Sequence, residues 1–458
     1  MEYKPTIGLE IHAELETQTK MFSRSCNDSE ESSPNVNITP VDLAHPGTLP
    51  VVNKEAVKKV IMVGVALEGE IADFTEFDRK NYFYPDIPKG YQISQYKYPL
   101  VSGGKIAGVK LTRIHLEEDT GTSQHKDDYS LVNYNRAGVP LMELVTEPVI
   151  TSSEEASKFA KEFQLLLQYL GVSKANMEKG EMRLEANISV SSDDKFGTKV
   201  EVKNLNSFRS LEKAIDFEIK RQIALLENGE KVVQETRGWH DEKQVTFSQR
   251  NKEYAEDYRY FPDPDIPKLK ISEIADFNIK ELPELPWQRR ERYQKYELGN
   301  DQVEMLVSDM SLGEYFDGEV KNAPLEEVKI ISNYITSDLV GLGGFGKVST
   351  GNLKDLAKLV TSGTLSSRGA KDTLKILYEE GGDTEKVAQK NNLIQQSDEG
   401  PLLEIVNKIL SENNSVVEEY KNGKESSLQF LIGQGMKETK GSANPQVLAK
   451  LIKELIGA

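Results

Sequence analysis

A change of pattern close to Pro286 constrains the fold more than any other feature of the sequence. Before it, segments rich in β-branched residues, such as LTRIHLEED, EANISVS and TKVEVKN, are typical of strands and alternate with amphipathic helices. Beyond it, apolar residues recur at helical spacing to the end of the chain. The prolines at 262, 264 and 267 exclude a helix in that segment and indicate an exit from the first domain. We therefore predict an α+β protein, in which a mixed region precedes an all-helical one.

Capping residues predict where three of the helices begin. Ser152, with Glu155 three residues later, forms a possible capping box at the start of the first helix. A second helix is expected to begin near Ser207. At the end of the chain Asn444 is the expected N-cap and Pro445 the first helical residue. The apolar stripes of the first two helices are most simply core-facing surface.

The length and the charge limit the classes of protein that this chain can belong to. With 458 residues it is expected to form roughly two to four domains. Its net charge of −17 is unlike that of a protein that simply coats nucleic acid, which is usually basic. Any contact with RNA must come from a local basic surface. Residues 421–458, with six lysines against three glutamates, are a candidate, although a solvated helical face would have the same composition.

Apolar runs, signal peptides and cysteines are the sequence features that indicate where a protein is located. The chain has no run of about 18 apolar residues and no recognisable signal peptide. With Cys26 as its only cysteine, it has neither an intrachain disulfide nor a thiolate-based zinc site. We expect a cytoplasmic protein that does not associate with a membrane.

The glycine-rich stretch 341–351 matches the pattern of the protein-kinase phosphate loop. That loop should lie near the start of a kinase domain, followed by a catalytic loop that contains histidine. No histidine follows residue 351, which excludes a kinase. We therefore interpret the stretch as a flexible hinge.

Acidic residues in apolar, strand-like segments are the main candidates for a site. Glu10 and His12 alternate along one segment, so both side chains would point to the same side of a strand. The other members of this set are Glu14, His115, Glu117, Glu118, Asp119, Glu185 and Glu201, with Lys203 beside the last. If these acids converge, they would suit Mg²⁺, which takes oxygen ligands. Exposed strand acids are also common without any ion.

The segment 77–95, FDRKNYFYPDIPKGYQISQ, combines cations with aromatic residues around a turn. Arg79, Lys80 and Lys89 could bind phosphates, and aromatic residues such as Tyr82 could bind a nucleotide. The alternative is a packed aromatic loop whose charges are solvated.

Seven stretches together resemble the B subunit of the tRNA-dependent amidotransferase family. They are IGLEIHAEL, HPGTLPVVNKEAV, FDRKNYFYPDIPKGYQISQ, IHLEEDTGTSQH, YSLVNYNRAGVPLMELVTEP, TKVEVKNLNSF and DYRYFPDPDIP, in the family's order. A weaker match, FLIGQGMKETKGSANPQ, lies near the end of the chain. The resemblance implies a cradle-like catalytic domain of mixed sheet over residues 1–292. It also implies a helical domain over 293–398 and a small helical tail that contacts tRNA over 399–458.

The resemblance implies a ligase that works with two partner subunits. An amidase (A) subunit would hydrolyse glutamine, and the ammonia would reach this chain through a channel. This chain would use ATP to phosphorylate the side-chain carboxylate of Glu on misacylated tRNA-Gln, or of Asp on misacylated tRNA-Asn. A small C subunit would complete the heterotrimer. The alternative within the same complex is a tRNA-binding scaffold that catalyses nothing.

The resemblance also implies roles for particular residues. The family's metal and channel positions fall on Glu10, His12, Glu118, Glu185 and Glu201. Glu117 ranks lower than Glu118, because neighbouring residues of a strand face opposite ways.

Cations near these acids complete the predicted site. Lys80 and Lys89, with Tyr82, are expected to serve ATP or the ammonia path, and Lys437 and Lys440 to contact tRNA phosphates. Many members of the family hold zinc with four cysteines near the N-terminus. Because only Cys26 is present here, we predict no zinc.

Overall fold

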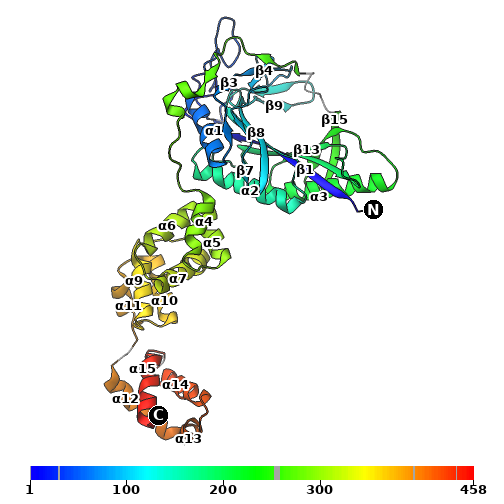
Figure 1. Cartoon of the computed structure of the whole chain (residues 1–458). Coiled ribbons are helices and arrows are strands. Elements are labelled where there is room, and N and C mark those ends of the chain that lie inside the picture. Colours follow the sequence, from blue (N-terminus) through cyan, green and yellow to red (C-terminus); the bar gives the residue numbers. More distant parts are fainter. Residues whose placement is uncertain (1, 29–30, 252–257, 396–397, 440, 458) are drawn as a thin grey trace. The chain divides into compact units, whose positions relative to one another are not determined.

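The computed structural model describes residues 2–28, 31–251, 258–395, 398–439 and 441–457 (Figure 1). The chain divides into two compact units, Met1–Pro286 and Trp287–Ala458. The first contains the sheets, and helices make up the regular structure described in the second, which confirms the predicted α+β class. The finer division at residues 292 and 398 stays a prediction.

A ten-stranded sheet is the centre of the first unit in the described part of the chain. Its main path runs β15-β14-β13-β12-β1-β11-β8-β6-β2, and β7 pairs with β8. The strands of this sheet are β1 (Lys4–Glu14), β2 (Glu70–Ile71), β6 (Val101–Ser102), β7 (Lys105–Ile106), β8 (Val109–Glu118), β11 (Pro140–Thr146), β12 (Met182–Ser191), β13 (Val200–Leu205), β14 (Glu235–His240) and β15 (Val245–Asn251). The first strand of the chain therefore lies in the middle of the sheet.

The residues of the central strands alternate between two faces. On β1, Ile7, Leu9 and Ile11 are buried, and Ile11 lies opposite Leu144 of β11 and Leu184 of β12. Because side chains of a strand point alternately to its two sides, the residues between them share the other face. That second face carries Glu10 and His12 on β1, Glu117 on β8, Glu143 on β11 and Glu185 on β12.

Three helices of this unit pack beside the sheet. They are α1 (Lys54–Ala66), α2 (Ser153–Tyr169) and α3 (Phe208–Glu227). The hydroxyls of Ser152 and Ser207 accept hydrogen bonds from the backbone N–H of Glu155 and Ser210, at 3.1 and 3.0 Å. The two predicted helix starts are thus confirmed. The Glu155 carboxylate accepts from the backbone of Thr151, so it contacts the residue before the cap.

Smaller sheets complete the first unit. The strands β4 (Asp78–Asn81), β5 (Tyr91–Ser94) and β16 (Phe261–Pro262) form one sheet in the order β16-β4-β5. A hairpin consists of β9 (Thr122–His125) and β10 (Ser130–Asn133), and β3 (Phe74–Thr75) pairs with β17 (Leu269–Lys270). Two short 3₁₀ turns follow, at Ile271–Glu273 and Ala275–Phe277. The proline-rich segment is free of helix, as predicted.

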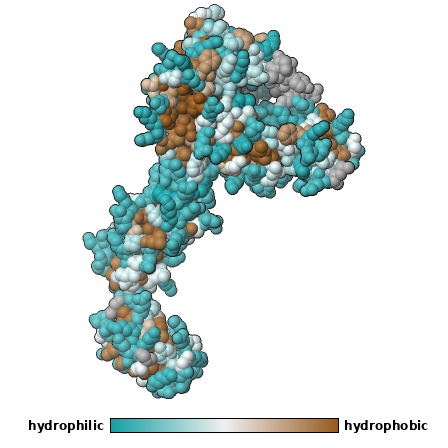
Figure 2. Space-filling view, in the orientation of Figure 1, coloured by the Kyte–Doolittle hydropathy of each residue, from teal (hydrophilic) through white to brown (hydrophobic). Residues whose placement is uncertain are grey.

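Helices and a six-residue π-helix at Tyr334–Leu339 form the second unit. The helices are α4 (Pro286–Gln294), α5 (Asn300–Ser308), α6 (Met310–Val320), α7 (Leu325–Asn333), α8 (Val340–Leu342), α9 (Asn352–Thr361), α10 (Ser367–Glu380), α11 (Thr384–Lys390), α12 (Glu399–Glu412), α13 (Asn414–Lys421), α14 (Ser426–Glu438) and α15 (Pro445–Ile456). Asn444 caps α15 and Pro445 is its first residue, as predicted. Within the described residues, no helix combines the length and the apolar character needed to cross a bilayer. The surface visible in Figure 2 is mostly hydrophilic.

The glycine-rich stretch 341–351 packs against neighbouring helices, which does not fit the predicted free hinge. The rings of Phe345 and Tyr315 stack with their centroids 4.5 Å apart, and a Cβ on Gly346 would meet the Tyr378 ring at 2.4 Å. The buried Glu319 carboxylate accepts a hydrogen bond from the backbone N–H of Gly351 at 2.7 Å, at the start of α9. Glycine is needed here for close packing and for positive φ angles, such as +53° at Gly346.

Candidate active site

A cleft of about 460 Å³ lies over the polar face of the large sheet. Acids, cations and tyrosines line most of it. The lining residues that matter below are Glu10, His12, Lys80, Tyr82, Tyr96, Arg113, His115, Glu117, Asp119, Glu143, Arg183, Glu185, Glu201, Lys203, Tyr258 and Tyr260. The strand register explains this convergence, because His12 lies opposite Glu143 on one side and Arg183 on the other, and Glu10 opposite Glu185.

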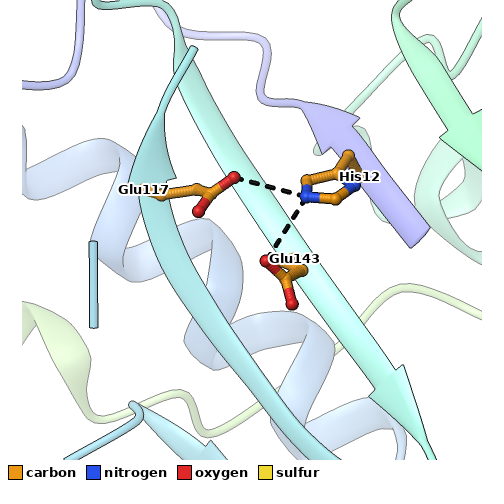
Figure 3. Close-up of side chains that lie close together, drawn as sticks. All are labelled: His12, Glu117 and Glu143. Atoms are coloured by element: carbon orange, nitrogen blue, oxygen red, sulfur yellow. Dashed lines mark ion pairs between the residues drawn. The ribbon is translucent and has the colours of Figure 1, made fainter. Parts of the chain in front are cut away.

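The first group of possible metal ligands is His12, Glu117 and Glu143, from β1, β8 and β11 (Figure 3). The Nε2 atom of His12 lies 3.3 Å from a carboxylate oxygen of Glu117 and 3.3 Å from one of Glu143. On the other side of these acids is the buried His115, whose Nε2 lies 3.5 Å from Glu143. Ser94 of β5 donates a hydrogen bond to Glu117 at 3.3 Å.

Burial and charge set the protonation of this first group. Burial lowers the pKa of His12, but its hydrogen bonds to Glu117 and Glu143 raise that pKa by more, to well above its ordinary value. Burial raises the pKa of Glu143, but the nearby histidines hold it well below its ordinary value. In this structure a charged imidazolium therefore holds two ionised carboxylates together in a buried site.

The second group, Glu10, Glu185 and Glu201, comes from β1, β12 and β13. Lys203 makes ion pairs with Glu185 at 2.9 Å and with Glu201 at 3.8 Å. The side-chain amide of Asn187 donates to Glu10 at 2.8 Å. Burial and the charges of Glu143, Glu185 and Glu201 raise the pKa of Glu10. A cation bound here would relieve this crowding of negative charge.

Both groups fit Mg²⁺ by the chemistry of their donors. Mg²⁺ prefers oxygen ligands and usually binds through one or two carboxylates. The second group supplies three carboxylates whose oxygens lie within 4.8 Å of one another. The first supplies two carboxylates, and His12 can join them as a ligand only when a bound cation displaces its proton.

Lys80 extends from β4 into the same cleft, as the sequence analysis predicted for a basic residue near the acids. Its ammonium lies 5.0 Å from the ring centre of Tyr258 and 5.9 Å from that of Tyr82. Burial lowers the pKa of Lys80, but Tyr260, Glu117, Tyr82 and Glu143 raise it by more, to above its ordinary value. Lys80 is thus a fixed positive charge facing the first acid group.

The structure does not bring Glu118 together with these acids. Glu118 pairs with Lys89 and accepts a hydrogen bond from the backbone N–H of Ile93 at 2.9 Å. Both charged residues line a separate small cavity. Glu117, which the sequence analysis ranked lower, holds the place beside His12. The alternation was recognised, but the choice between the two neighbours needed the pairing of β8 with β11. Lys89 likewise does not line the cleft that contains Lys80.

Glu143 is absent from the residues predicted from the sequence, and His115 was given no role there. Glu143 lies in the segment LMELVT, where a single acid interrupts an apolar strand. The same signal singled out Glu10, so it was available for Glu143. Arg113 and Arg183 were also missed; Arg113 lies 3.6 Å from Glu143, and Arg183 lies 2.9 Å from Asp119.

Asp119 lines the cleft, and its ion pairs with two arginines should stabilise the fold. The buried carboxylate pairs with Arg136 at 2.7 Å and with Arg183 at 2.9 Å. Burial raises the pKa of Asp119, but the two arginines lower it by more, to about 2 from an ordinary value of 3.8. Because the folded pKa is the lower one, this stabilisation is full above pH 4 and is lost as the pH falls toward 2.

We expect Asp119→Asn to lower the free energy of unfolding at pH 7 by about 2 kcal/mol, because it removes the buried charge that the half-buried guanidinium groups of Arg136 and Arg183 share. The loss should shrink as the pH approaches 3. Urea denaturation followed by fluorescence at several pH values measures both effects. Asp127→Asn, in the exposed turn of the β9–β10 hairpin, is the control. An equal loss at pH 7 and pH 3 would contradict the electrostatic origin.

Of the two lysines predicted to contact tRNA, one can be placed. Lys437 is exposed in the last turn of α14. Lys440 lies outside the described residues.

Comparisons with known proteins cover nearly the whole chain. Residues 5–275 match the GatB/GatE catalytic domain, and residues 320–456 match the GatB domain. A curated relative from Moorella thermoacetica, the B subunit of an aspartyl/glutamyl-tRNA(Asn/Gln) amidotransferase, is 43% identical over 99% of this chain and 100% of its own length. Proteins of the same name from Dehalococcoides mccartyi and Thermodesulfovibrio yellowstonii are each 42% identical, over 99% and 100% of this chain and 99% and 100% of their own lengths. The chain therefore belongs to the family of B subunits of tRNA-dependent amidotransferases.

Proposed function

We propose that this chain uses ATP to phosphorylate the side-chain carboxylate of Glu or Asp on a misacylated tRNA, and that ammonia then displaces the phosphate to give the amide. The relatives' names specify aspartyl/glutamyl-tRNA(Asn/Gln), which supports Glu on tRNA-Gln, Asp on tRNA-Asn, or both, as substrates. The observation that carries the proposal is the cleft, where buried acids face Lys80 and tyrosines.

The chemistry explains why both signs of charge are needed. Transfer of a phosphoryl group from ATP is helped by cations that offset charge on the phosphate oxygens. Lys80, Arg113 and Arg183 line the cleft and are suited to this role. Mg²⁺ held by His12, Glu117 and Glu143, or by Glu10, Glu185 and Glu201, would add positive charge at the same oxygens. Tyr82, beside Lys80, is available to the nucleotide.

Ammonia must reach the acyl phosphate without loss, and we propose that glutamine is its source. An amidase (A) subunit would release the ammonia, and a small C subunit would complete a heterotrimer. On the side of this chain, the pair of Lys89 and Glu118 lines a cavity whose walls share Gln92, Asp119 and Thr120 with the cleft. This shared wall supports a role for Lys89 near the ammonia path.

A scaffold that only binds tRNA is the alternative function. It would not need two groups of buried acids held against a charged imidazole and a lysine, because unpaired buried charge is costly. Amide formation by the reconstituted complex on both misacylated tRNAs, with and without ATP, tests the proposal. We expect amide only with ATP, and one phosphate released per amide. Amide formation that is independent of ATP would contradict it.

The C-terminal helices are proposed to hold tRNA. Helices α12, α14 and α15 share a buried cluster that includes Leu402, Leu431 and Leu448, so residues 399–458 have a hydrophobic core of their own. Exposed lysines such as Lys437 can contact phosphates, which positions RNA without reading its sequence.

We expect deletion of residues 399–458 to raise the Kd for tRNA by about tenfold and to flatten its dependence on salt, because phosphate contacts release counterions. Glutamine hydrolysis by the complex should stay within about twofold of the intact complex. Binding titrations at several salt concentrations measure the first effect. Unchanged affinity and salt slope would show that the tail does not bind tRNA.

A further inference from the structure

Five tyrosine rings form a continuous row along the cleft. In order, the row contains Tyr84, Tyr82, Tyr258, Tyr260 and Tyr96. The first three contacts are edge-to-face, with ring centres 5.8, 5.8 and 6.1 Å apart. The last is a stacked pair at 4.3 Å with an interplanar angle of 12°. All members except Tyr84 line the cleft that contains the acids and Lys80.

Contacts between distant segments hold this tyrosine row in place. Strand β16 pairs with β4, which puts Phe261 opposite Arg79. The guanidinium of Arg79 pairs with Asp263 at 2.7 Å, and the amide of Asn81 donates to the carbonyl of Tyr258 at 3.2 Å. These bonds fix the segment that carries Tyr258 and Tyr260 against the strand that leads to Tyr82. The tyrosine row is therefore held in place by specific contacts.

The two ends of the row are exposed, unlike its middle. The side chains of Tyr84 and Tyr96 are 51% and 52% exposed, and Phe83, next to Tyr84 in the chain, is 78% exposed. Large aromatic rings that face solvent beside a cleft are typical of binding surfaces. Aromatic side chains bind unpaired nucleobases by stacking, because every base offers a flat face.

We propose that the two exposed ends of the tyrosine row bind the unpaired 3′ end of the aminoacylated tRNA, whose bases stack on Tyr84 and Tyr96. This inference rests on the proposed function and names the surface that receives its RNA substrate. Two exposed rings at opposite ends of the row, and Phe83 beside one of them, offer more stacking surface than the single base of ATP uses. Stacking also suits a chain with a net charge of −17, which cannot rely on phosphate contacts everywhere.

The experiment uses the assembled complex with Tyr84→Ala, Tyr96→Ala and the matching Phe variants. Steady-state amidation gives the KM for misacylated tRNA and the KM for ATP separately. We expect each Ala variant to raise the KM for tRNA by about tenfold, as for the loss of one stacked base, with the KM for ATP nearly unchanged. The Phe variants should keep the wild-type values, because they keep the ring. Tyr129→Ala removes an equally exposed tyrosine, 56% exposed in the β9–β10 hairpin, and is the control.

Binding of uncharged tRNA separates this inference from the proposed function. Shortening the tRNA by its last three nucleotides should weaken binding to the wild-type complex and should weaken binding to the Ala variants much less. An equal loss in all proteins would overturn the inference. A raised KM for ATP with an unchanged KM for tRNA would also overturn it and assign the row to the adenine of ATP. Failure of the wild-type complex to form amide would refute the proposed function, whatever the binding result.

Discussion

Replacing Glu143 with Gln should reduce amidation by about a hundredfold, because losing a charged group that holds the other site residues in place typically costs roughly that much. Glu143 contacts both histidines of the site and lies near Arg113. The amide keeps the shape of the side chain but removes the charge that stabilises the imidazolium of His12, or a cation bound in place of its proton. Amide formation on misacylated tRNA measures the loss, and hydrolysis of glutamine by the complex should survive.

Two further variants control this experiment. Glu147→Gln changes an acid that lies beyond the end of β11 and bonds to Thr112, so amidation should be unaffected. Glu118→Gln changes the acid that the sequence analysis preferred, and its separate cavity predicts a different phenotype. We expect it to impair amidation from glutamine more than amidation from added ammonium. Full activity of Glu143→Gln would remove the first acid group from the mechanism.

Lys80→Met should lower amidation by about a hundredfold whether glutamine or ammonium is the nitrogen source. The reason is that the Lys80 ammonium faces Glu117 and Glu143 in the cleft, where it can offset phosphate charge. Its pKa lies above the ordinary value, so deprotonation should not contribute between pH 6 and 9. Rates measured across that range with both nitrogen sources test this.

The exposed Lys97→Met variant is the control for the change of residue type, and a thermal melt checks that Lys80→Met stays folded. Rescue of Lys80→Met by added ammonium would place Lys80 on the ammonia path and would contradict its role with phosphate.

Much of the fold could be predicted from local patterns. The caps at Ser152, Ser207 and Asn444 depend on residues within one turn of each other, so the sequence contains the whole signal. The glycine-rich stretch was misinterpreted as a hinge because its packing depends on Tyr378 and Tyr315, which lie outside it in the sequence. The glycine content of the stretch predicted a flexible backbone, but contacts with distant aromatic residues hold it in one conformation.

The candidate site shows the same limit. Alternation along β1 correctly placed Glu10 and His12 on one face, because it is a property of a single strand. Choosing Glu117 over Glu118 required the register between β8 and β11, and a slip of one residue would exchange the two side chains. Recognising Glu143 as a partner of His12 required knowing that β11 lies beside β1.

The central position of β1 has a consequence for how the chain folds during synthesis. This strand is synthesised well before its neighbours β11 and β12, so Glu10 meets Glu185 only after most of the first unit has been made. Pairings between residues so distant in sequence form slowly, because the entropy cost of closing the loop comes before the favourable contacts are made. Until then β1 is a strand with one apolar face and two unpaired edges. The centre of the large sheet can therefore form only after β12 has been synthesised.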